Sequence, residues 1–372
     1  MRAATLPIQR PRDARVLVVD RCGRIDDHPR HVLATLPRPG DCVIANDAAT
    51  LPASLAGIHQ RTDALIEVRL AGRASLDREQ VSRFSAIVFG AGDFHTTPEA
   101  RPAPPRLHAG DRLAFGATLR ATVVRLRDHP RFVDLQFDGT STQIWHAIAT
   151  HGKPVQYEHL EAALRLWDTW TPFAAQPVAF EPPSAGFALD WQLLDAWRAR
   201  QVAFATLTHA AGLSTTGDAA LDRLLPFDEP YRIPSATAAL IASTRARHGR
   251  VIAIGTTVVR ALEHAAASSG FVRAGDGLAT QRIGPATRLH VVDAMLSGTH
   301  EPDTSHYQLL RAFAGHGTLQ RITATLESHD YRTHEFGDSV WLERAVHAST
   351  RAAACGCDDG APGIARHPVP AV

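Results

Sequence analysis

The stretch whose residues could most clearly bind a ligand is "RVIAIGTTVVRALE", residues 250–263. A β-branched run ends at a glycine, two threonines follow, and a helical pattern with one arginine and one glutamate begins. A helix that starts at the carboxyl end of a parallel strand presents free backbone amides, a natural place for an anion or nucleotide. Either threonine can cap that helix, and the arginine can add a charged fork. The same residues also make an ordinary capped turn, and no P-loop lysine is present, so spacing alone leaves both interpretations open.

Further polar residues follow predicted strands. Asn46 and Asp47 close "GDCVIAND", where an amide and a carboxylate can bind a ribose or simply form an Asx turn. His209 opens the small-residue loop "THAAGLSTTGD" and can act as an acid or base, or serve only as a polar loop residue. His300 precedes a helical pattern, and Asp338 precedes an aromatic-rich strand. Each of these side chains also has a purely structural interpretation.

The composition limits the kinds of site that the chain can contain. None of the 20 histidines falls in a zinc-binding spacing, and Cys355 and Cys357 supply at most half of a zinc site, so we predict no metal. The formal net charge is +1, which does not point to a nucleic-acid binder. Lys153 is the only lysine, so contacts to phosphate or carboxylate must come mostly from arginines, backbone amides or hydroxyls.

The elements that must position these residues alternate between strands and helices in two parts of the chain. The patterns predict strands at 15–20, 40–47, 202–209 and 250–255, and helices at 157–170, 189–201, 235–249, 258–268 and 304–315. Between them, residues 58–150 contain short β-rich runs separated by Gly, Pro or Asp, as in a small antiparallel barrel or sandwich.

The domain organisation follows from this layout. We predict an α/β class protein in which a large α/β domain (1–57 and 152–347) is interrupted by a small antiparallel β-barrel domain (58–151). A disordered tail is predicted for 348–372, because it is rich in small residues, Pro and Gly. The chain has no long apolar run and no secretory signal pattern, so we expect a cytoplasmic protein, without a membrane partner and monomeric.

Taken in order, the motifs resemble a known family. "RPGDCVIANDAATLPASLAG", "PPSAGF", "GRVIAIGTTVVRALE" and "YRTHEFGDSVWL" occur in sequence within residues 6–345. This order is similar to that of the S-adenosylmethionine:tRNA ribosyltransferase-isomerases of queuosine biosynthesis. The most specific element is the stretch at 250–263, which matches the family's G-R-V-I-A-V-G-T-T-S-V-R-A-L-E almost residue for residue.

The resemblance implies an α/β domain with an inserted β-barrel, and a reaction. S-adenosylmethionine, as co-substrate, would give its ribosyl group to the 7-aminomethyl-7-deazaguanine of a tRNA, and isomerisation would yield epoxyqueuosine. Such chemistry needs a base for the proton beside the sulfonium, an acid for the departing adenine, and contacts to the ribose. Matching positions give Asp47, His209, Glu229, His300 and Asp338 as catalytic candidates. They give Asn46, Gly255, Thr256, Thr257, Arg260 and Glu263 as S-adenosylmethionine contacts.

Several positions depart from the family pattern. Histidines are replaced by Ala188 and Phe227, and Asp303 stands where the family has a lysine. A hydroxyl and two arginines of the family pattern are lost at Ala48, Ala49 and Ser54. Lost basic residues weaken a site for polyanionic tRNA. Three functions therefore stay open: the usual family activity, a diverged paralogue with another acceptor, and a non-catalytic binding protein. From the sequence we also expect Arg260→Ala to weaken ligand binding or turnover without unfolding the protein.

Overall fold

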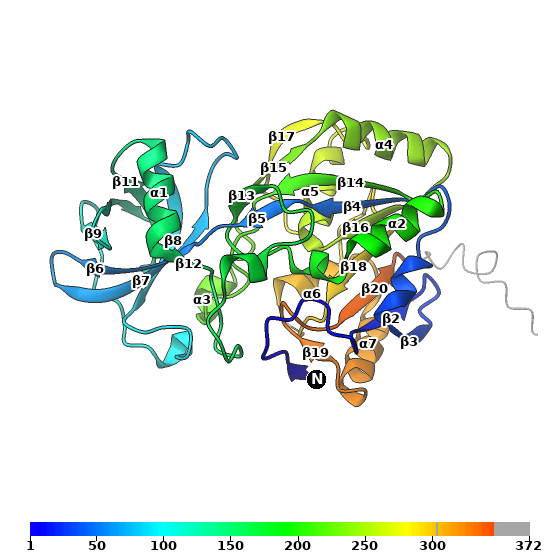
Figure 1. Cartoon of the computed structure of the whole chain (residues 1–372), viewed down its shortest axis with the longest axis horizontal. Coiled ribbons are helices and arrows are strands. Elements are labelled where there is room, and N and C mark those ends of the chain that lie inside the picture. Colours follow the sequence, from blue (N-terminus) through cyan, green and yellow to red (C-terminus); the bar gives the residue numbers. More distant parts are fainter. Residues whose placement is uncertain (303, 346–372) are drawn as a thin grey trace, which may run out of the picture.

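Apolar strands buried on both faces form the centre of the protein, whose computed structural model describes residues 1–302 and 304–345. Four of them are parallel, namely β14 (Ala203–His209), β4 (Cys42–Asn46), β16 (Val251–Ile254) and β18 (Ala294–Gly298). The full nine-stranded order is β17-β15-β14-β4-β16-β18-β20-β2-β3 (Figure 1). The outer strands are β17 (Gly275–Ala279), β15 (Glu229–Ile233), β20 (Ser339–Glu343), β2 (Arg15–Val19) and β3 (Ile25–Pro29).

Side chains that alternate along the central strands enter two separate cores. Ile44 and Ala253 face a core that contains residues of α4 (Ser235–Ala246), α5 (Thr256–Ala266), α6 (Ser305–Leu310) and α7 (His316–Ser328). Val43 and Ile252 face the opposite core, with η1 (Arg30–Ala34), η4 (Ser184–Ala188) and α2 (Trp191–Ala199). The Asp190 side chain caps α2 by accepting a hydrogen bond from the Leu193 amide. The sheet is thus covered on both faces, as burial of its apolar strands requires.

The second unit is a closed antiparallel barrel. Its strands are, in spatial order, β6 (Ser54–His59), β7 (Ala64–Gly72), β8 (Arg83–Gly90), β11 (Phe132–Phe137), β10 (Leu119–Leu126) and β9 (Arg112–Phe115). Pairing of β9 with β6 closes the barrel, and β12 (Gly152–Lys153) adds to β6. Helix α1 (Ser141–His151) begins at a capping box formed by Thr140 and Gln143 and contributes Ile144 and Ile148 to the barrel core.

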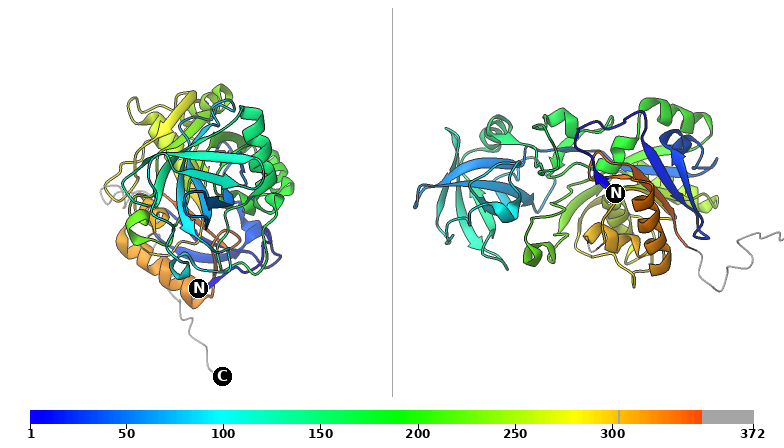
Figure 2. Two further views of the ribbon diagram at one scale, coloured as in Figure 1. Left: turned by 90° about the vertical axis from the view of Figure 1, so that its left-hand side faces the viewer. Right: turned by 90° about the horizontal axis from the view of Figure 1, so that it is seen from below.

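The barrel lies beside one end of the large sheet, and Figure 2 shows the two units next to each other from below. A short parallel pair, β5 (Ala48–Thr50) and β13 (Gln176–Ala179), connects them. The segment after β14 also reaches the barrel, because Leu213 of the loop and Leu221 of the following helix α3 (Ala219–Asp222) belong to the barrel core. The remaining short elements are β1 (Arg2–Ala3), β19 (Arg332–Thr333), η2 (Pro98–Ala100) and η3 (Leu166–Thr169).

This architecture confirms the predicted fold class, an α/β domain with an inserted antiparallel β-barrel. The boundaries at 57/58 and 151/152 stay a prediction, and the barrel strands begin at Ser54. The helix predicted over 157–170 is wrong: this segment contains only the 3₁₀ turn η3. The predicted tail 348–372, with Cys355 and Cys357, lies outside the described residues. Across residues 1–302 and 304–345, no helix is long and apolar enough to span a membrane.

Candidate active site

Most of the predicted site residues lie near the edge where the four parallel strands end, whereas Glu263 binds the chain just before β18 begins. Strand β14 ends at His209, β4 at Asn46, and β18 at Gly298, while Gly255 follows the last residue of β16. Strand β20 runs antiparallel to β18 with Ser339 opposite Gly298, which brings Asp338 to the same edge. Ligands of open α/β sheets bind at such carboxyl ends. The edge faces the barrel, because the chain passes from β4 through β5 into β6 (Figure 1).

Asn46 joins two of these strand ends. Its amide nitrogen donates to the His209 carbonyl at 2.9 Å, and its oxygen accepts from the His209 amide at 2.9 Å. Its oxygen also accepts from the Ala48 amide at 3.1 Å, and its nitrogen lies 3.4 Å from the Thr257 hydroxyl. A buried amide with this many partners serves mainly to hold the ends of β4 and β14 together. It places Thr257 beside both strands.

The Asp47 carboxylate is held by two hydroxyls of β14. Thr206 donates to one oxygen at 2.7 Å and Thr208 to the other at 2.6 Å. The side chain is only partly buried, so lone pairs on both oxygens remain for a further donor. The arrangement fixes the direction of the carboxylate without neutralising its charge.

The turn before α5 uses Gly255 in a way that only glycine adopts readily. Its φ is +93°, and it is itself the N-cap of α5, with no side-chain cap. The predicted cap by Thr256 or Thr257 is therefore wrong. Both threonines lie inside the first turn, Thr256 one residue and Thr257 two residues too late for a cap, which must precede the helix.

Arg260 is buried and bonded rather than free to reach a ligand. It pairs with the Glu229 carboxylate and donates to the carbonyls of Phe227, Ala279 and Gln281. The other Glu229 oxygen accepts from the Gly212 amide at 2.6 Å. Burial raises the pKa of Glu229, and the charge of Arg260 offsets part of that effect. The pair links α5 to the start of β15 and, through the Glu229–Gly212 hydrogen bond, to the loop after β14.

His209 lies against this pair with an unusual lack of hydrogen bonds. The ring is fully buried, and neither nitrogen has a hydrogen-bond partner within the described part of the chain. Nε2 lies 3.4 Å from a Glu229 oxygen. Burial, and then the charge of Arg260, hold the His209 pKa well below its usual value, so the ring is neutral at pH 7. This contact is therefore not a salt bridge.

Two further predicted carboxylates are saturated by the protein. Glu263 accepts from the backbone amides of His290, Val291 and Val292 at 2.7, 2.9 and 2.9 Å. Asp338 accepts from the Arg15 and Arg332 amides, each at 2.9 Å, and from the Arg332 guanidinium at 2.8 Å. Carboxylates with three or more donors hold loops in place. Their roles as ligand or catalytic groups stay predictions.

His300 belongs to a small cluster of neutral imidazoles. Its Nε2 lies 2.7 Å from the Ser297 hydroxyl, and its ring stacks on His306 with centroids 4.8 Å apart. Burial and the neighbouring imidazoles hold the His300 pKa well below its usual value. Burial lowers the His306 pKa to about 4. Both rings therefore act as hydrogen-bonding groups, not as cations, near neutral pH.

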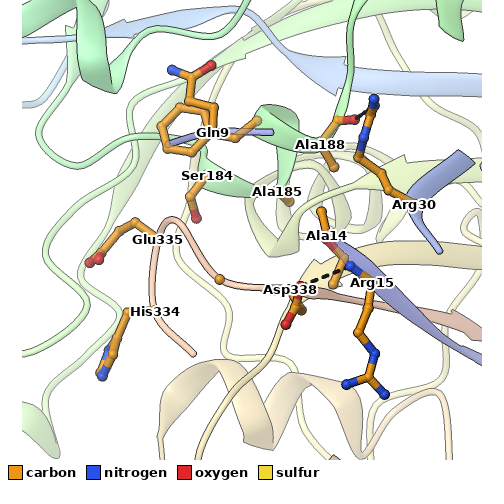
Figure 3. A pocket seen from close by; sticks show the side chains of 14 residues that line it. Gln9, Ala14, Arg15, Arg30, Ser184, Ala185, Ala188, His334, Glu335 and Asp338 are labelled. Carbon is orange, nitrogen blue, oxygen red and sulfur yellow. Dashed lines mark hydrogen bonds between the residues drawn. The ribbon is translucent and has the colours of Figure 1, made fainter. Parts of the chain in front are cut away.

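A pocket beside these residues contains groups that were not among the predicted site residues. Ser184, Ala185, Arg15, Arg30, His334 and Glu335 line it together with Asp338 (Figure 3). Its cavity volume is about 20 Å³, which is room for about one water. Ser184 and Glu335 lie within the quoted motifs "PPSAGF" and "YRTHEFGDSVWL". Their chemistry depends on neighbours distant in sequence, so spacing carried no signal for them.

Two other unpredicted groups lie at the junction of the units. Tyr157 donates a hydrogen bond to Glu181, whose second oxygen accepts from the Ser214 amide at 3.0 Å. Burial, with the nearby charge of Glu335, raises the Glu181 pKa to about 7. No group of three or more His, Cys, Asp or Glu side chains suited to a metal occurs in the described residues.

Comparisons with known proteins agree with the ordered motifs. A family model described as "Queuosine biosynthesis protein" matches residues 1–342. Proteins named S-adenosylmethionine:tRNA ribosyltransferase-isomerase are similar to this chain over most of their length. The one from Symbiobacterium thermophilum is 31% identical and covers 91% of this chain and 95% of its own. The one from Sorangium cellulosum is 33% identical and covers 93% and 96%.

A solved structure is also similar. The crystal structure of an S-adenosylmethionine tRNA ribosyltransferase from Thermotoga maritima has a TM-score of 0.47 and 22% identity to this chain. It covers 91% of this chain and 95% of its own.

Proposed function

Because this chain belongs to the queuosine biosynthesis protein family, we propose that it is an S-adenosylmethionine:tRNA ribosyltransferase-isomerase. In the proposed reaction, the ribosyl group of S-adenosylmethionine is transferred to the 7-aminomethyl-7-deazaguanine of a tRNA and isomerised to epoxyqueuosine. Adenine and methionine leave. The observation that carries the proposal is the match of residues 1–342 to the family, since it includes every predicted site residue.

The site geometry supports a division of labour within this proposal. We assign the ligand-facing roles to Asp47, His209, His300 and the turn Gly255–Thr257, which share the sheet edge that faces the barrel. We assign positioning roles to the residues whose polar atoms are consumed inside the protein, which are Asn46, Glu229, Arg260, Glu263 and Asp338. S-adenosylmethionine is then a co-substrate, no metal is needed, and tRNA is the partner. A tRNA acceptor implies a cytoplasmic location, and we propose a monomer.

A second function is favoured by one specific observation. Phe227, which replaces a histidine of the family pattern, stacks on the barrel residue Phe132 with centroids 4.4 Å apart. An apolar ring thus stands between the units where a proton-transfer group was expected. This supports a diverged member that uses S-adenosylmethionine or another nucleoside with a different acceptor.

One incubation separates these functions. The purified protein is mixed with S-adenosylmethionine and with tRNA that bears 7-aminomethyl-7-deazaguanine, and adenine release and tRNA mass are measured. The family activity predicts adenine release together with a matching gain in tRNA mass. Adenine release without tRNA gain would favour the diverged member. Binding of S-adenosylmethionine with neither product would indicate a non-catalytic binding protein and would reject both enzymatic proposals.

A further inference from the structure

Two exposed tryptophans lie at the 3₁₀ turn η3. Trp167 within the turn is 65% exposed, and Trp170 directly after it is 39% exposed. Indole rings are large and mostly apolar, so exposing two of them to water is costly unless a partner covers them. We call Trp167, Trp170 and the neighbouring Arg165 the tryptophan surface.

The tryptophan surface is attached to the pocket at the sheet edge through Gln9. The Gln9 side chain lines that pocket, as does Ser184 (Figure 3). Its amide nitrogen donates to the carbonyls of Asp168 and Trp170 at 2.9 and 2.8 Å. The turn that carries the two indoles is therefore one glutamine side chain away from the pocket.

A second set of hydrogen bonds holds η3 on the strand that follows Asp47. The Thr50 hydroxyl of β5 donates to the Thr169 carbonyl at 3.1 Å, and the Thr50 carbonyl accepts from Trp170 Nε1, also at 3.1 Å. Trp170 is thus fixed by its nitrogen while part of its ring stays exposed. A ring fixed in this way loses little conformational entropy when a ligand stacks on it.

Trp167 has a cation close to its ring. The Arg165 guanidinium carbon lies 5.8 Å from the ring centroid, within the range of a cation–π contact. The Asp168 carboxylate accepts from the Arg165 backbone amide at 2.8 Å, and no carboxylate in residues 1–302 and 304–345 forms a salt bridge with the guanidinium. An indole beside a cation without an acidic partner suits a base and its phosphate.

The proposed reaction requires such a surface near the sheet edge. An enzyme that modifies a base in a nucleic acid takes that base out of its stack, so the neighbouring bases lose a stacking partner. Unpaired RNA bases stack readily on aromatic rings and on guanidinium planes. Because the formal net charge is only +1, attraction of phosphates by the whole protein is weak, and stacking must supply a larger share of the affinity.

We propose that the tryptophan surface stacks unpaired bases of the tRNA loop that flank the nucleotide at the sheet edge. This inference rests on the function proposed above and identifies where its RNA partner is held. Trp167 supplies the main stacking face, Trp170 supplies a second one, and Arg165 contacts a phosphate.

The test is the Kd of the full-length protein for an RNA stem–loop with the sequence of a tRNA anticodon arm. An RNA duplex of the same length serves as the comparison, and both are measured by fluorescence anisotropy at several salt concentrations. The proteins are the wild type, Trp167→Ala, Trp167→Phe, Arg165→Gln and, as a control, Phe271→Ala. Phe271 is 74% exposed and follows α5, whose 11 residues place it about 16 Å from the edge.

We expect Trp167→Ala to raise the Kd for the stem–loop about 5- to 150-fold and to leave the Kd for the duplex nearly unchanged. Trp167→Phe keeps an aromatic face and should retain most of the affinity. The ratio of the Trp167→Ala and wild-type values should be the same at every salt concentration, because stacking is not screened. Arg165→Gln should reduce the slope of log Kd against log salt by about one, and Phe271→Ala should behave as wild type.

The other outcomes overturn the proposal. Equal stem–loop Kd values for wild type and Trp167→Ala would reject the surface, and adenine release by the wild type would show that the proposed function still stands. Equal weakening of stem–loop and duplex binding would reject base stacking. A wild-type dimer that Trp167→Ala converts to a monomer, with unchanged RNA affinity, would assign the surface to contact between copies of the chain.

Two further results also decide the matter. A wild type that binds no stem–loop and releases no adenine would overturn the proposed function and this proposal with it. If thermal melting shows that Trp167→Ala does not fold, Arg165→Gln decides: a smaller salt slope supports the proposal, and an unchanged slope rejects it.

Discussion

Replacing Glu181 by glutamine should make the protein more stable at high pH and leave it unchanged at low pH. Glu181 is fully buried at the junction between the units, with Tyr157 on one oxygen and the Ser214 amide on the other. Tyr157 in turn lies 3.1 Å from the Thr215 carbonyl and can donate to it. A protonated Glu181 can therefore donate to Tyr157 while still accepting from Ser214. Glutamine reproduces both bonds in this neutral arrangement without the option of ionising.

The magnitude follows from the pKa of the folded protein. Burial raises the Glu181 pKa from 4.5 to about 7. Between these values the unfolded chain releases the proton and the folded protein keeps it, so stability falls as pH rises. The stabilising effect is fully present below pH 4.5 and is lost by about pH 7. Since one pKa unit corresponds to about 1.4 kcal/mol, wild type loses about 3 kcal/mol that the variant retains.

The assay is urea denaturation of both proteins at several pH values from 4.5 to 8.5, because urea adds no charge screening. The free energy of unfolding of Glu181→Gln minus that of wild type should be near zero at pH 4.5 and about 3 kcal/mol at pH 8. Glu161→Gln, at an exposed position, should show no such trend. A difference that does not change with pH, or a less stable variant at pH 8, would refute the reasoning.

Three more substitutions test the structural roles assigned to motif residues. Arg260→Ala should lower the free energy of unfolding by about 3–5 kcal/mol, since it leaves the Glu229 carboxylate buried without its cation; a loss under about 1 kcal/mol in urea denaturation would contradict this. Glu263→Gln should cost about 1–3 kcal/mol and weaken hydrogen-exchange protection of the amides at 290–292; unchanged protection would exclude the anchoring role. Gly255→Ala should lower the free energy of unfolding by about 1–2 kcal/mol. The cause is backbone strain at φ +93°, not a clash, because the nearest atom to the new methyl lies 3.4 Å away; equal stability of the two proteins in urea denaturation would show that the turn relaxes.

The contacts of Arg260 in the structure differ from those expected from the sequence. Its position one turn into a helix, after a strand and a glycine, suggested a charged fork for a ligand. The structure instead gives its guanidinium an acidic partner and three carbonyls from other parts of the chain. A sequence motif identifies a residue that matters, but the motif alone cannot say whether that residue contacts ligand or protein.

The wrong prediction of a helix over 157–170 also arises from contacts that the local sequence does not show. Its apolar spacing fits a helix, yet Leu160 is buried with Phe187 and Phe336 from elsewhere in the chain. The Gln156 side chain accepts from the Leu164 amide and donates to the Ala162 carbonyl, which satisfies the segment without helical bonds. Tertiary contacts thus overrode a weak local propensity. They also left His159 where it meets Glu335.

The sequence by itself determined the architecture and predicted the edge of the sheet at which the site should lie. The strand stretches "CVIA" and "VIAI" are apolar at every position, which requires cover on both faces. Polar residues at the ends of such strands must meet at one edge of a parallel sheet. Only the tertiary structure decided which polar groups are consumed there and which are left for chemistry. Glu263, which matches the family motif, accepts three backbone amides, whereas Glu335, within "YRTHEFGDSVWL", meets a single imidazole 176 residues away. Hydrogen-bond satisfaction depends on partners that folding brings together, and no local spacing encodes it.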